Sequence, residues 1–174
     1  MDTNPHASTD KIGRGMLTLV WIFALGLLTL IFGRWEDHQV NPNQSPSSQR
    51  LGTTTEVLLT ANRQHHYLAN GQINNQPVTF LLDTGATHVS VPAHLAQKLG
   101  LERGQAMTST TANGKVTVYS TRISRLDLGA IQLYNLQGSI NPGMKDDEVL
   151  LGMSALKQLE IRQLGDTLTL IQHH

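Results

Sequence analysis

Hydrophobic and polar positions divide the chain into three stretches. Residues 15–33 are almost entirely apolar and contain no charged residue. Residues 34–56 are rich in Asn, Gln, Ser, Thr and Pro, whereas from residue 57 onward short apolar runs alternate with turn residues. This pattern predicts an N-terminal helix, a flexible linker and a folded body over residues 57–174.

The apolar run has the length of a membrane-spanning helix. Its residues would form an α-helix of about 28 Å, close to the thickness of the hydrocarbon core of a bilayer. A cleaved secretory signal is a second interpretation, but its apolar stretch is usually about 7 to 15 residues long and is followed by a small-x-small site. A buried core helix fits less well, because this run is apolar on every face. We therefore expect one transmembrane helix over residues 15–33.

The charges beside the apolar run predict its orientation. Lys11 and Arg14 precede the run, whereas Arg34 follows it next to two acidic residues. Because basic residues favour the cytoplasmic side, we expect residues 1–14 in the cytoplasm, the helix in the inner membrane, and the body in the periplasm or outside the cell. The linker, with few apolar residues, is expected to be a tether that spans roughly 25 Å.

Turn signals in the body separate short strand-like runs. The clearest turn signals are the residue pairs 70–71, 74–75, 113–114 and 165–166. Strands are expected over residues 65–73, 77–82, 87–91, 105–111, 115–128, 131–140 and 167–171. Short helices are expected over residues 92–100, which Pro92 opens and Gly100 closes, and over residues 153–159. The predicted fold class is all-β, a small closed or nearly closed β-barrel with one or two short helices.

Composition excludes several classes of function. Lys and Arg together number 13, as do Asp and Glu, so the chain lacks the positive field that holds nucleic acid. Cysteine is absent, which excludes disulfides, thiolate metal sites and a cysteine nucleophile. We find no internal repeat of about 20 to 50 residues. The body is therefore expected to be a single unit.

The most informative stretch is FLLDTGATHVSV, residues 80–91. Three apolar residues lead to Asp83, then Thr84 and Gly85 turn the chain. A carboxylate at the end of an apolar strand is unfavourable unless its surroundings satisfy it, and a glycine lets the backbone approach a second chain or a substrate closely. An ordinary turn is the alternative, since Asp, Thr and Gly all favour turns. The apolar flanks favour a functional site at Asp83.

With these flanks, the sequence resembles the retropepsin-like aspartic proteases, and in particular the single-pass membrane members from bacteria. The similarity extends from about residue 67 to residue 171, and its motifs are FLLDTGAT at 80–87, TANG at 111–114 and VLLGMSAL at 149–156. The resemblance implies a protease barrel that needs no cofactor.

The resemblance also implies a role for each motif. Asp83 would be the catalytic carboxylate, and the residues that support it in the catalytic loop would be Thr84, Gly85 and Ala86. Thr84 would bond across the subunit interface. The tip of a flap that closes on substrate would be formed by Ala112, Asn113 and Gly114. The residues that pass behind the catalytic loop would be Leu150, Leu151 and Gly152.

Aspartic proteolysis needs two carboxylates that share one proton. One takes a proton from the attacking water, while the other donates to the carbonyl oxygen of the substrate. Asp127 and Asp166 lack the apolar lead-in and the Thr-Gly turn of Asp83, and we interpret them as turn residues. The second carboxylate is therefore expected from Asp83 of another copy, across the two-fold axis of a homodimer.

The remaining polar residues give no metal-site pattern. His65 and His66 would point to opposite faces of a strand and are interpreted as surface residues. His88 and His94 lack metal-site spacing with a carboxylate, and His88 is expected to pack or to lie at the rim of the site. The acidic run at 146–148 is interpreted as a solvated loop, with cation binding as an open alternative. No metal is expected, and no phosphate loop or serine nucleophile motif is found.

These features predict a membrane-anchored aspartic endopeptidase that cuts an extended peptide between the flap and paired Asp83 carboxylates. Its expected partners are a second copy of the chain, a protein or peptide substrate and the membrane, without nucleic acid. The alternative is a non-proteolytic domain of the same fold that serves as a membrane-tethered dimerisation or peptide-binding module. The presence of Asp83, Thr84 and Gly85 together favours the enzyme, because a structural module does not need them.

Overall fold

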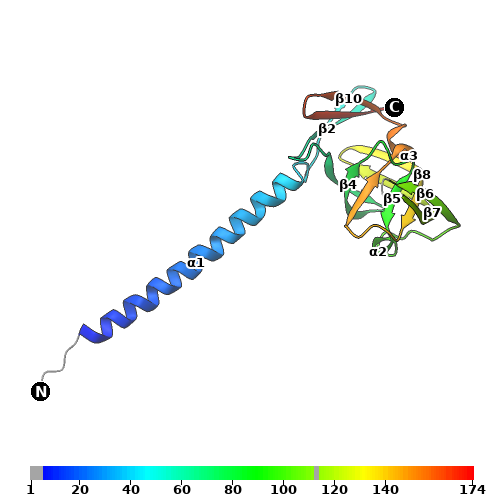
Figure 1. Cartoon of the computed structure of the whole chain (residues 1–174). Coiled ribbons are helices and arrows are strands. Elements are labelled where there is room, and N and C mark those ends of the chain that lie inside the picture. Colours follow the sequence, from blue (N-terminus) through cyan, green and yellow to red (C-terminus); the bar gives the residue numbers. More distant parts are fainter. Residues whose placement is uncertain (1–5, 112–113) are drawn as a thin grey trace, which may run out of the picture. The chain divides into compact units, whose positions relative to one another are not determined.

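The computed structural model describes residues 6–111 and 114–174. The chain consists of two compact units that divide between His38 and Gln39. Helix α1, His6–Val40, accounts for the first unit and continues into the beginning of the second. The second unit, which we call the body, holds the described strands and two short helices (Figure 1).

Helix α1 exposes its apolar side chains over residues 16–38. Residues 16–38 are all exposed, and Met16–Val40 is the one helix in the described part of the chain that is long and apolar enough to cross a membrane. A helix that packs on a protein core instead concentrates its apolar residues on one face. The length and composition of α1 are thus those of the predicted span.

A sheet in the body closes on itself to form a barrel. In hydrogen-bonding order its strands are β3 (Leu68–Ile73), β4 (Gln76–Leu82), β9 (Glu148–Leu151), β5 (Val89–Pro92), β8 (Ile131–Asn141), β7 (Gly114–Leu128) and β6 (Ala106–Thr111). Closure comes from a second pairing of β3, in which Gln72 and Ile73 lie opposite Asp127 and Leu126 of β7. The predicted small closed β-barrel is confirmed (Figure 1).

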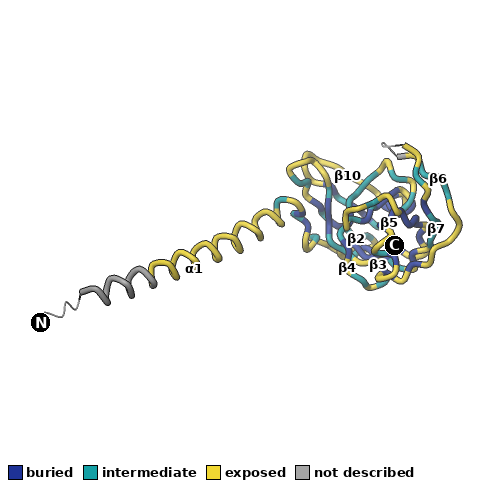
Figure 2. Tube along the Cα trace, turned by 60° about the horizontal axis from the view of Figure 1, so that its bottom comes forward, coloured by how far each residue is buried: buried dark blue, intermediate teal, exposed yellow. Residues whose placement is uncertain are grey.

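Aliphatic side chains fill the barrel. The apolar lead-in to Asp83 buries Phe80 completely, and the strand that leaves the turn buries Val89 and Val91. Ile123 and Leu136 meet them in the same core from β7 and β8. The buried positions, dark blue in Figure 2, follow the strands of the body. Because the strands before and after the turn are both anchored in the core, the position of Asp83 directly after β4 is fixed.

A second sheet, which we call the terminal sheet, combines the two ends of the body. Its strands, in hydrogen-bonding order, are β1 (Ser47–Leu51), β2 (Thr54–Thr60), β11 (Thr167–His173) and β10 (Glu160–Leu164). The two central strands bury alternate side chains in the core, including Val57 and Leu170. The two edge strands, β1 and β10, are exposed at every residue.

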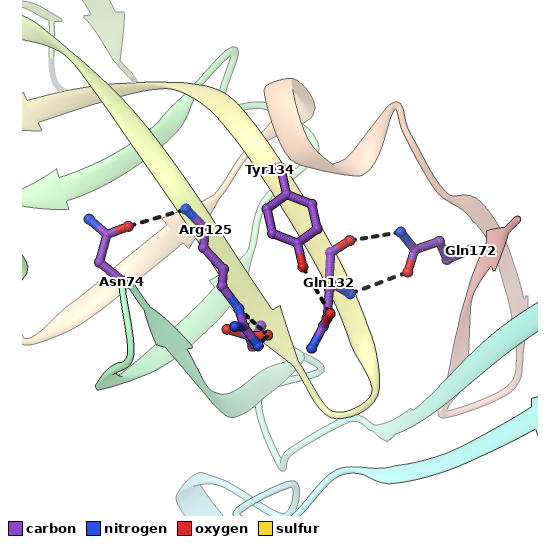
Figure 3. A network of polar contacts seen from close by, with 6 residues as sticks. Asn74, Arg125, Gln132, Tyr134 and Gln172 are labelled. Atoms are coloured by element: carbon purple, nitrogen blue, oxygen red, sulfur yellow. Dashed lines mark hydrogen bonds and ion pairs between the residues drawn. The ribbon is translucent and has the colours of Figure 1, made fainter.

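A polar network connects the barrel to the terminal sheet (Figure 3). The backbone N–H of Gln132 in β8 donates to Oε1 of Gln172 in β11 at 3.2 Å, and Nε2 of Gln172 donates to the carbonyl of Gln132 at 2.8 Å. The hydroxyl of Tyr134 donates to Oε1 of Gln132 at 2.9 Å. The side chain of Gln172 thus satisfies both backbone groups of Gln132 at the start of β8, as a neighbouring strand would.

The prediction of a flexible linker over residues 34–56 is wrong for most of its length. α1 extends to Val40, and the first two strands begin at Ser47 and Thr54. All residues of β1 are exposed, and all except Leu51 are polar. No hydrophobic alternation therefore marks this strand in the sequence.

Asn43 holds the segment between α1 and β1 against strands β2 and β3. It is buried, and its Oδ1 accepts a hydrogen bond from the backbone N–H of Thr60 at 2.7 Å. Its Nδ2 donates to the carbonyls of Leu68 at 2.6 Å and Thr60 at 2.9 Å. Hydrogen bonds of a buried polar side chain, rather than burial of apolar side chains, therefore order this polar segment.

Two further strands and one turn differ from the prediction. β9 and β10 were not expected as strands, and the pair at residues 70–71 lies inside β3 rather than in a turn. A Cβ on Gly71 would lie 2.6 Å from the ring of Phe80, so the glycine serves close packing. The chain turns instead at Asn74 and Asn75, whose φ values are 49° and 65°.

Both predicted helices exist but are short. α2 spans Ala93–Ala96 and α3 spans Met153–Leu156, against predicted ranges of 92–100 and 153–159. Gly100 has a φ of 64°, a left-handed conformation that ends the turn after α2 as expected.

Candidate active site

Asp83 begins the turn that follows β4, and the turn starts from a parallel pair of strands. β4 and β9 lie side by side with Leu82 opposite Leu151. The backbone N–H of Asp83 donates to the carbonyl of Leu151 at 3.2 Å. The resemblance implies that Leu151 lies behind this turn, and the structure brings the two segments together there.

Hydrogen bonds within the turn orient the Asp83 carboxylate. Its Oδ1 accepts a hydrogen bond from the backbone N–H of Gly85 at 2.8 Å. The backbone carbonyl of Asp83 accepts a second one from the N–H of Ala86 at 3.2 Å. A Cβ on Gly85 would lie 3.1 Å from that same Oδ1. Glycine therefore leaves room for the carboxylate, whose Oδ2 accepts no hydrogen bond within the described residues. We call residues 83–88 the Asp83 loop.

The start of α3 supports the Asp83 loop from behind. The backbone N–H groups of Met153 and Ser154 donate to the carbonyls of Ala86 and Thr87 at 2.8 and 2.9 Å. A Cβ on Gly152 would lie 2.6 Å from the carbonyl oxygen of Ala86. The third motif is therefore in contact with the first, and its glycine is required by the close approach of two backbones.

Ser154 is a support that the sequence analysis missed. It is buried, its hydroxyl donates to the carbonyl of Gln137 at 2.7 Å, and it accepts a hydrogen bond from the N–H of Val89 at 3.0 Å. One side chain thus joins α3, β8 and the strand that leaves the Asp83 loop. A serine two residues after a helix-opening glycine was the signal available, but its hydrogen-bond partners come from distant parts of the sequence.

Asp83 lies in a cavity of about 590 Å³ between the Asp83 loop and the β6–β7 hairpin, which we call the cleft. The hairpin contributes Met107 and the three residues after it, together with Val118. On the other side, the cleft is lined by loop residues that include Asp83 and His88. Asp83 and the β6–β7 hairpin thus line the same cavity.

The predicted flap tip falls mostly outside the described residues. Ala112 and Asn113 are not described. Gly114 begins β7 opposite Thr111 with a φ of 110°, so the chain reverses direction at the expected place. The hairpin itself is present, and its inner side lines the cleft.

The other predicted site residues have distinct surroundings. Thr84 is exposed and makes no hydrogen bond within the described part of the chain, so its hydroxyl is available to a partner. Leu150 lies opposite Ser90 of β5 and also lines the cleft.

The interpretation of Asp127 as a turn residue is wrong. It lies within β7 with 9% of its surface exposed. Arg125 donates to its Oδ1 from Nε at 3.0 Å and from Nη2 at 2.7 Å, and this pairing makes burial of the carboxylate tolerable. This hydrogen bond raises the pKa of Arg125. Asp127 does not line the cleft. Its ion pair is structural and supplies no second carboxylate beside Asp83.

The remaining acidic residues also lie away from the cleft. Asp166 is exposed in the turn between β10 and β11, as expected. Asp147, in the loop before β9, lies 2.7 Å from Nε2 of His94. Among the described residues no group of three or more His, Cys, Asp or Glu side chains gathers as a metal site would require.

The structure corrects one detail of the histidine predictions. His65 is a surface residue as expected, but it lies in a turn with a φ of 60° and not on a strand. His88 is half-buried and lines the cleft with Asp83, so it belongs to the wall of the site. The sequence placed His88 five positions after Asp83, but the curvature of the turn decides which way it faces.

Comparison with known proteins agrees with this geometry. The profile of a family described as "gag-polyprotein putative aspartyl protease" matches residues 69–158, which include the Asp83 loop, the hairpin and α3. The chain belongs to the retropepsin-like aspartic protease family. A crystal structure of a retropepsin-like aspartic protease from Rickettsia conorii is similar at 26% identity with a TM-score of 0.57, covering 74% of this chain and 94% of that one.

Two curated relatives are similar over most of this retropepsin-like chain. An uncharacterized protein encoded in the cobV 5′ region of Sinorhizobium sp. is 25% identical over 170 residues, covering 90% of this chain and 73% of the relative. An uncharacterized protein of Rickettsia prowazekii is 26% identical over 139 residues, covering 78% of this chain and 59% of the relative. The similarity to the first relative therefore extends N-terminally beyond the family match.

Proposed function

We propose that this chain is a membrane-anchored aspartic endopeptidase that acts as a homodimer. The observation that carries the proposal is the position of Asp83, whose carboxylate faces a cleft of about 590 Å³ beneath the β6–β7 hairpin. A cleft of this size between a hairpin and a carboxylate suits an extended peptide. Asp83 is the one acidic side chain that lines this cleft among the described residues.

A second copy of the chain would supply the missing carboxylate. General acid and general base catalysis require a proton donor and a proton acceptor at the same peptide bond. Two carboxylates that share one proton fill both roles, because close like charges do not ionise together. In a homodimer Asp83 from each copy would lie at the two-fold axis, and the exposed Thr84 would donate its hydroxyl hydrogen bond across that axis.

The terminal sheet offers a surface for this second copy. β10 is an edge strand whose free backbone groups are available for pairing, and Leu164 at its end is 84% exposed. Exposed edge strands with apolar residues readily pair with another chain. We infer that β10 lies in the dimer interface.

The apolar helix would hold both copies in one membrane. The exposed apolar surface of α1 is unfavourable in water and favourable in lipid. Anchoring raises the effective concentration of one copy for the other, so a weak interface suffices. Since the body begins at Gln39, within the last turn of α1, the substrate would be a protein close to the membrane. The flanking charges favour the N-terminus in the cytoplasm and the body outside it.

The proposal is tested by replacing the carboxylate with its uncharged isostere. We expect full-length wild-type protein in detergent to cut peptides of a random library at a consensus sequence, and Asp83→Asn to reduce the rate by at least about 10³-fold. Asp166→Asn, in an exposed turn, is the matched control and should retain activity. Binding of peptides without cleavage by wild type would instead support the non-proteolytic module.

A further inference from the structure

A second cavity adjoins the cleft and has a different chemical character. It has a volume of about 710 Å³ and shares His88 and Met107 with the cleft. Its charged lining residues are Glu102, Arg103 and Arg122. We call it the side cavity. Because two lining residues are common to both cavities, a peptide in the cleft can place a side chain in the side cavity.

Hydrogen bonds hold one wall of the side cavity in place. The segment after α2 pairs with β7, since the N–H of Gly104 donates to the carbonyl of Ser120 at 2.8 Å and the N–H of Ser120 donates to the carbonyl of Gln105 at 2.9 Å. The hydroxyl of Thr121 donates to the carbonyl of Glu102 at 2.7 Å. The wall is therefore fixed before any ligand binds, which lowers the entropy lost on binding.

The charges of the side cavity favour an anion. The guanidinium of Arg103 lies over the ring of Tyr119, 3.2 Å from the ring centroid, which restricts its orientation. Arg122 is exposed and forms no ion pair with any described residue. Glu102 is the acidic residue of the lining, so two guanidinium groups face one carboxylate. Guanidinium groups bind carboxylates through paired, charge-assisted hydrogen bonds.

His88 adds a hydrogen-bond donor at the junction of the two cavities. Its Nδ1 is enclosed and has no hydrogen-bond partner within the described residues. Because Nδ1 is enclosed, Nε2 is the ring nitrogen of His88 that can donate an N–H hydrogen bond to a ligand.

We propose that the side cavity is a specificity subsite for an acidic side chain, Asp or Glu, of the peptide substrate. This inference rests on the proposed function and adds the substrate class. The carboxylate of the substrate accepts hydrogen bonds from Arg122 and from Nε2 of His88, while Arg103 adds positive charge. The backbone of the substrate remains in the cleft beneath the hairpin. An uncharged Gln of the same shape loses the charge-assisted part of these bonds.

The test uses two pools of fluorescent decapeptides that differ only in one fixed Glu or Gln, with the fixed position moved along the peptide. Cleavage by the full-length protein in detergent gives kcat and KM, and anisotropy with Asp83→Asn gives Kd without cleavage. We expect one position at which Glu is preferred over Gln by about fivefold, in KM and Kd rather than in kcat.

Two variants of opposite charge change, and one that keeps the charge of Arg122, sharpen the test. Arg122→Gln should reduce the Glu-over-Gln preference toward one, and Arg122→Lys should restore part of it. Glu102→Gln, in the same cavity, should increase the preference. An equal preference for both pools in wild type, or a preference that ignores both variants, would overturn the subsite.

The outcomes separate this inference from the proposed function. If wild type cuts neither pool but Asp83→Asn binds the Glu pool more tightly in an Arg122-dependent way, the subsite stands and the protease assignment fails. If both pools are cut equally well, the protease assignment stands and the subsite fails. Vesicles with anionic lipid headgroups are the third probe. Competition by these headgroups, without discrimination between the peptide pools, would assign the side cavity to lipid and overturn the proposal.

Discussion

The Asp83 loop and the terminal sheet differ in how many of their groups have partners within one chain. In the loop, backbone groups of Asp83, Gly85, Ala86 and Thr87 are bonded to β9, to α3 or within the turn itself. In the terminal sheet, both edge strands are exposed at every residue. One chain thus holds the carboxylate of the proposed catalytic site in a bonded loop, and it leaves exposed the edge strand that we propose joins two copies.

The largest structural effect is expected from filling the space at Gly152. In Gly152→Ala the new Cβ would clash with the backbone carbonyls of Ala86 and His88, and backbone cannot move aside as a flexible side chain can. We expect a loss of stability of about 3 kcal/mol together with loss of activity. Gly165→Ala is the control, because a Cβ there would meet no other atom and the only cost would be the strain of alanine at a φ of 58°. Thermal unfolding of both variants measures the difference, and equal losses would show that the loop is not tightly supported.

Removal of the Ser154 hydroxyl should have the next largest effect. Ser154→Ala leaves the N–H of Val89 without its acceptor in a buried position. We expect a loss of about 1–3 kcal/mol, measured by chemical denaturation. Ser47→Ala, on the exposed strand β1, should change stability by less than about 0.5 kcal/mol. A neutral Ser154→Ala would show that the side chain of Ser154 does not support the strand that leaves the Asp83 loop.

A change on the terminal sheet should separate assembly from folding. Leu164→Lys introduces a charge on β10 at a residue that is 84% exposed, so the fold should keep its stability. The affinity of the dimer should fall by about tenfold, since an edge lysine opposes strand pairing. Analytical ultracentrifugation in detergent measures this, with Leu51→Lys on the opposite edge as the control. A larger effect from Leu51→Lys would assign the interface to β1 instead.

The smallest effect concerns pH and the charged residues of β10. A hydrogen bond from Arg162, and a second from His173, lower the pKa of Glu160 below its ordinary value of 4.5. A lowered pKa in the folded state gives stability that is present above the unfolded pKa and is lost as pH falls through the folded pKa. Glu160→Gln should therefore lower Tm slightly near pH 7 and not at all at strongly acidic pH. A Tm difference that is unchanged by pH would rule out this ionic contribution.

Local sequence patterns predicted the barrel and the position of Asp83. Phe80 and Val89 lie in strands whose apolar residues are buried, so hydrophobic periodicity locates them directly. The Thr-Gly turn after Asp83 is also local. These elements need no information from distant parts of the chain.

The rest depends on partners that periodicity does not reveal. β1 and β10 are exposed strands, and Asn43 is ordered by hydrogen bonds to backbone groups that lie 17 and 25 positions away. Asp127 is buried because Arg125, two residues earlier on the same face of β7, neutralises it. The side of the cleft on which His88 lies follows from the three-dimensional course of the turn. The surroundings of these residues are set by tertiary structure, which local sequence patterns do not reveal.

The requirement for two Asp83 carboxylates from two copies is tested most directly by mixing. Wild-type chain is held at constant amount, and Asp83→Asn chain is added in detergent until subunits exchange, with copurification of tagged chains to verify mixed dimers. Random pairing predicts that activity falls to about one half with one equivalent of Asp83→Asn and to about one quarter with three. Activity that stays constant while mixed dimers form would show that one carboxylate per active unit suffices, and would contradict the proposed mechanism.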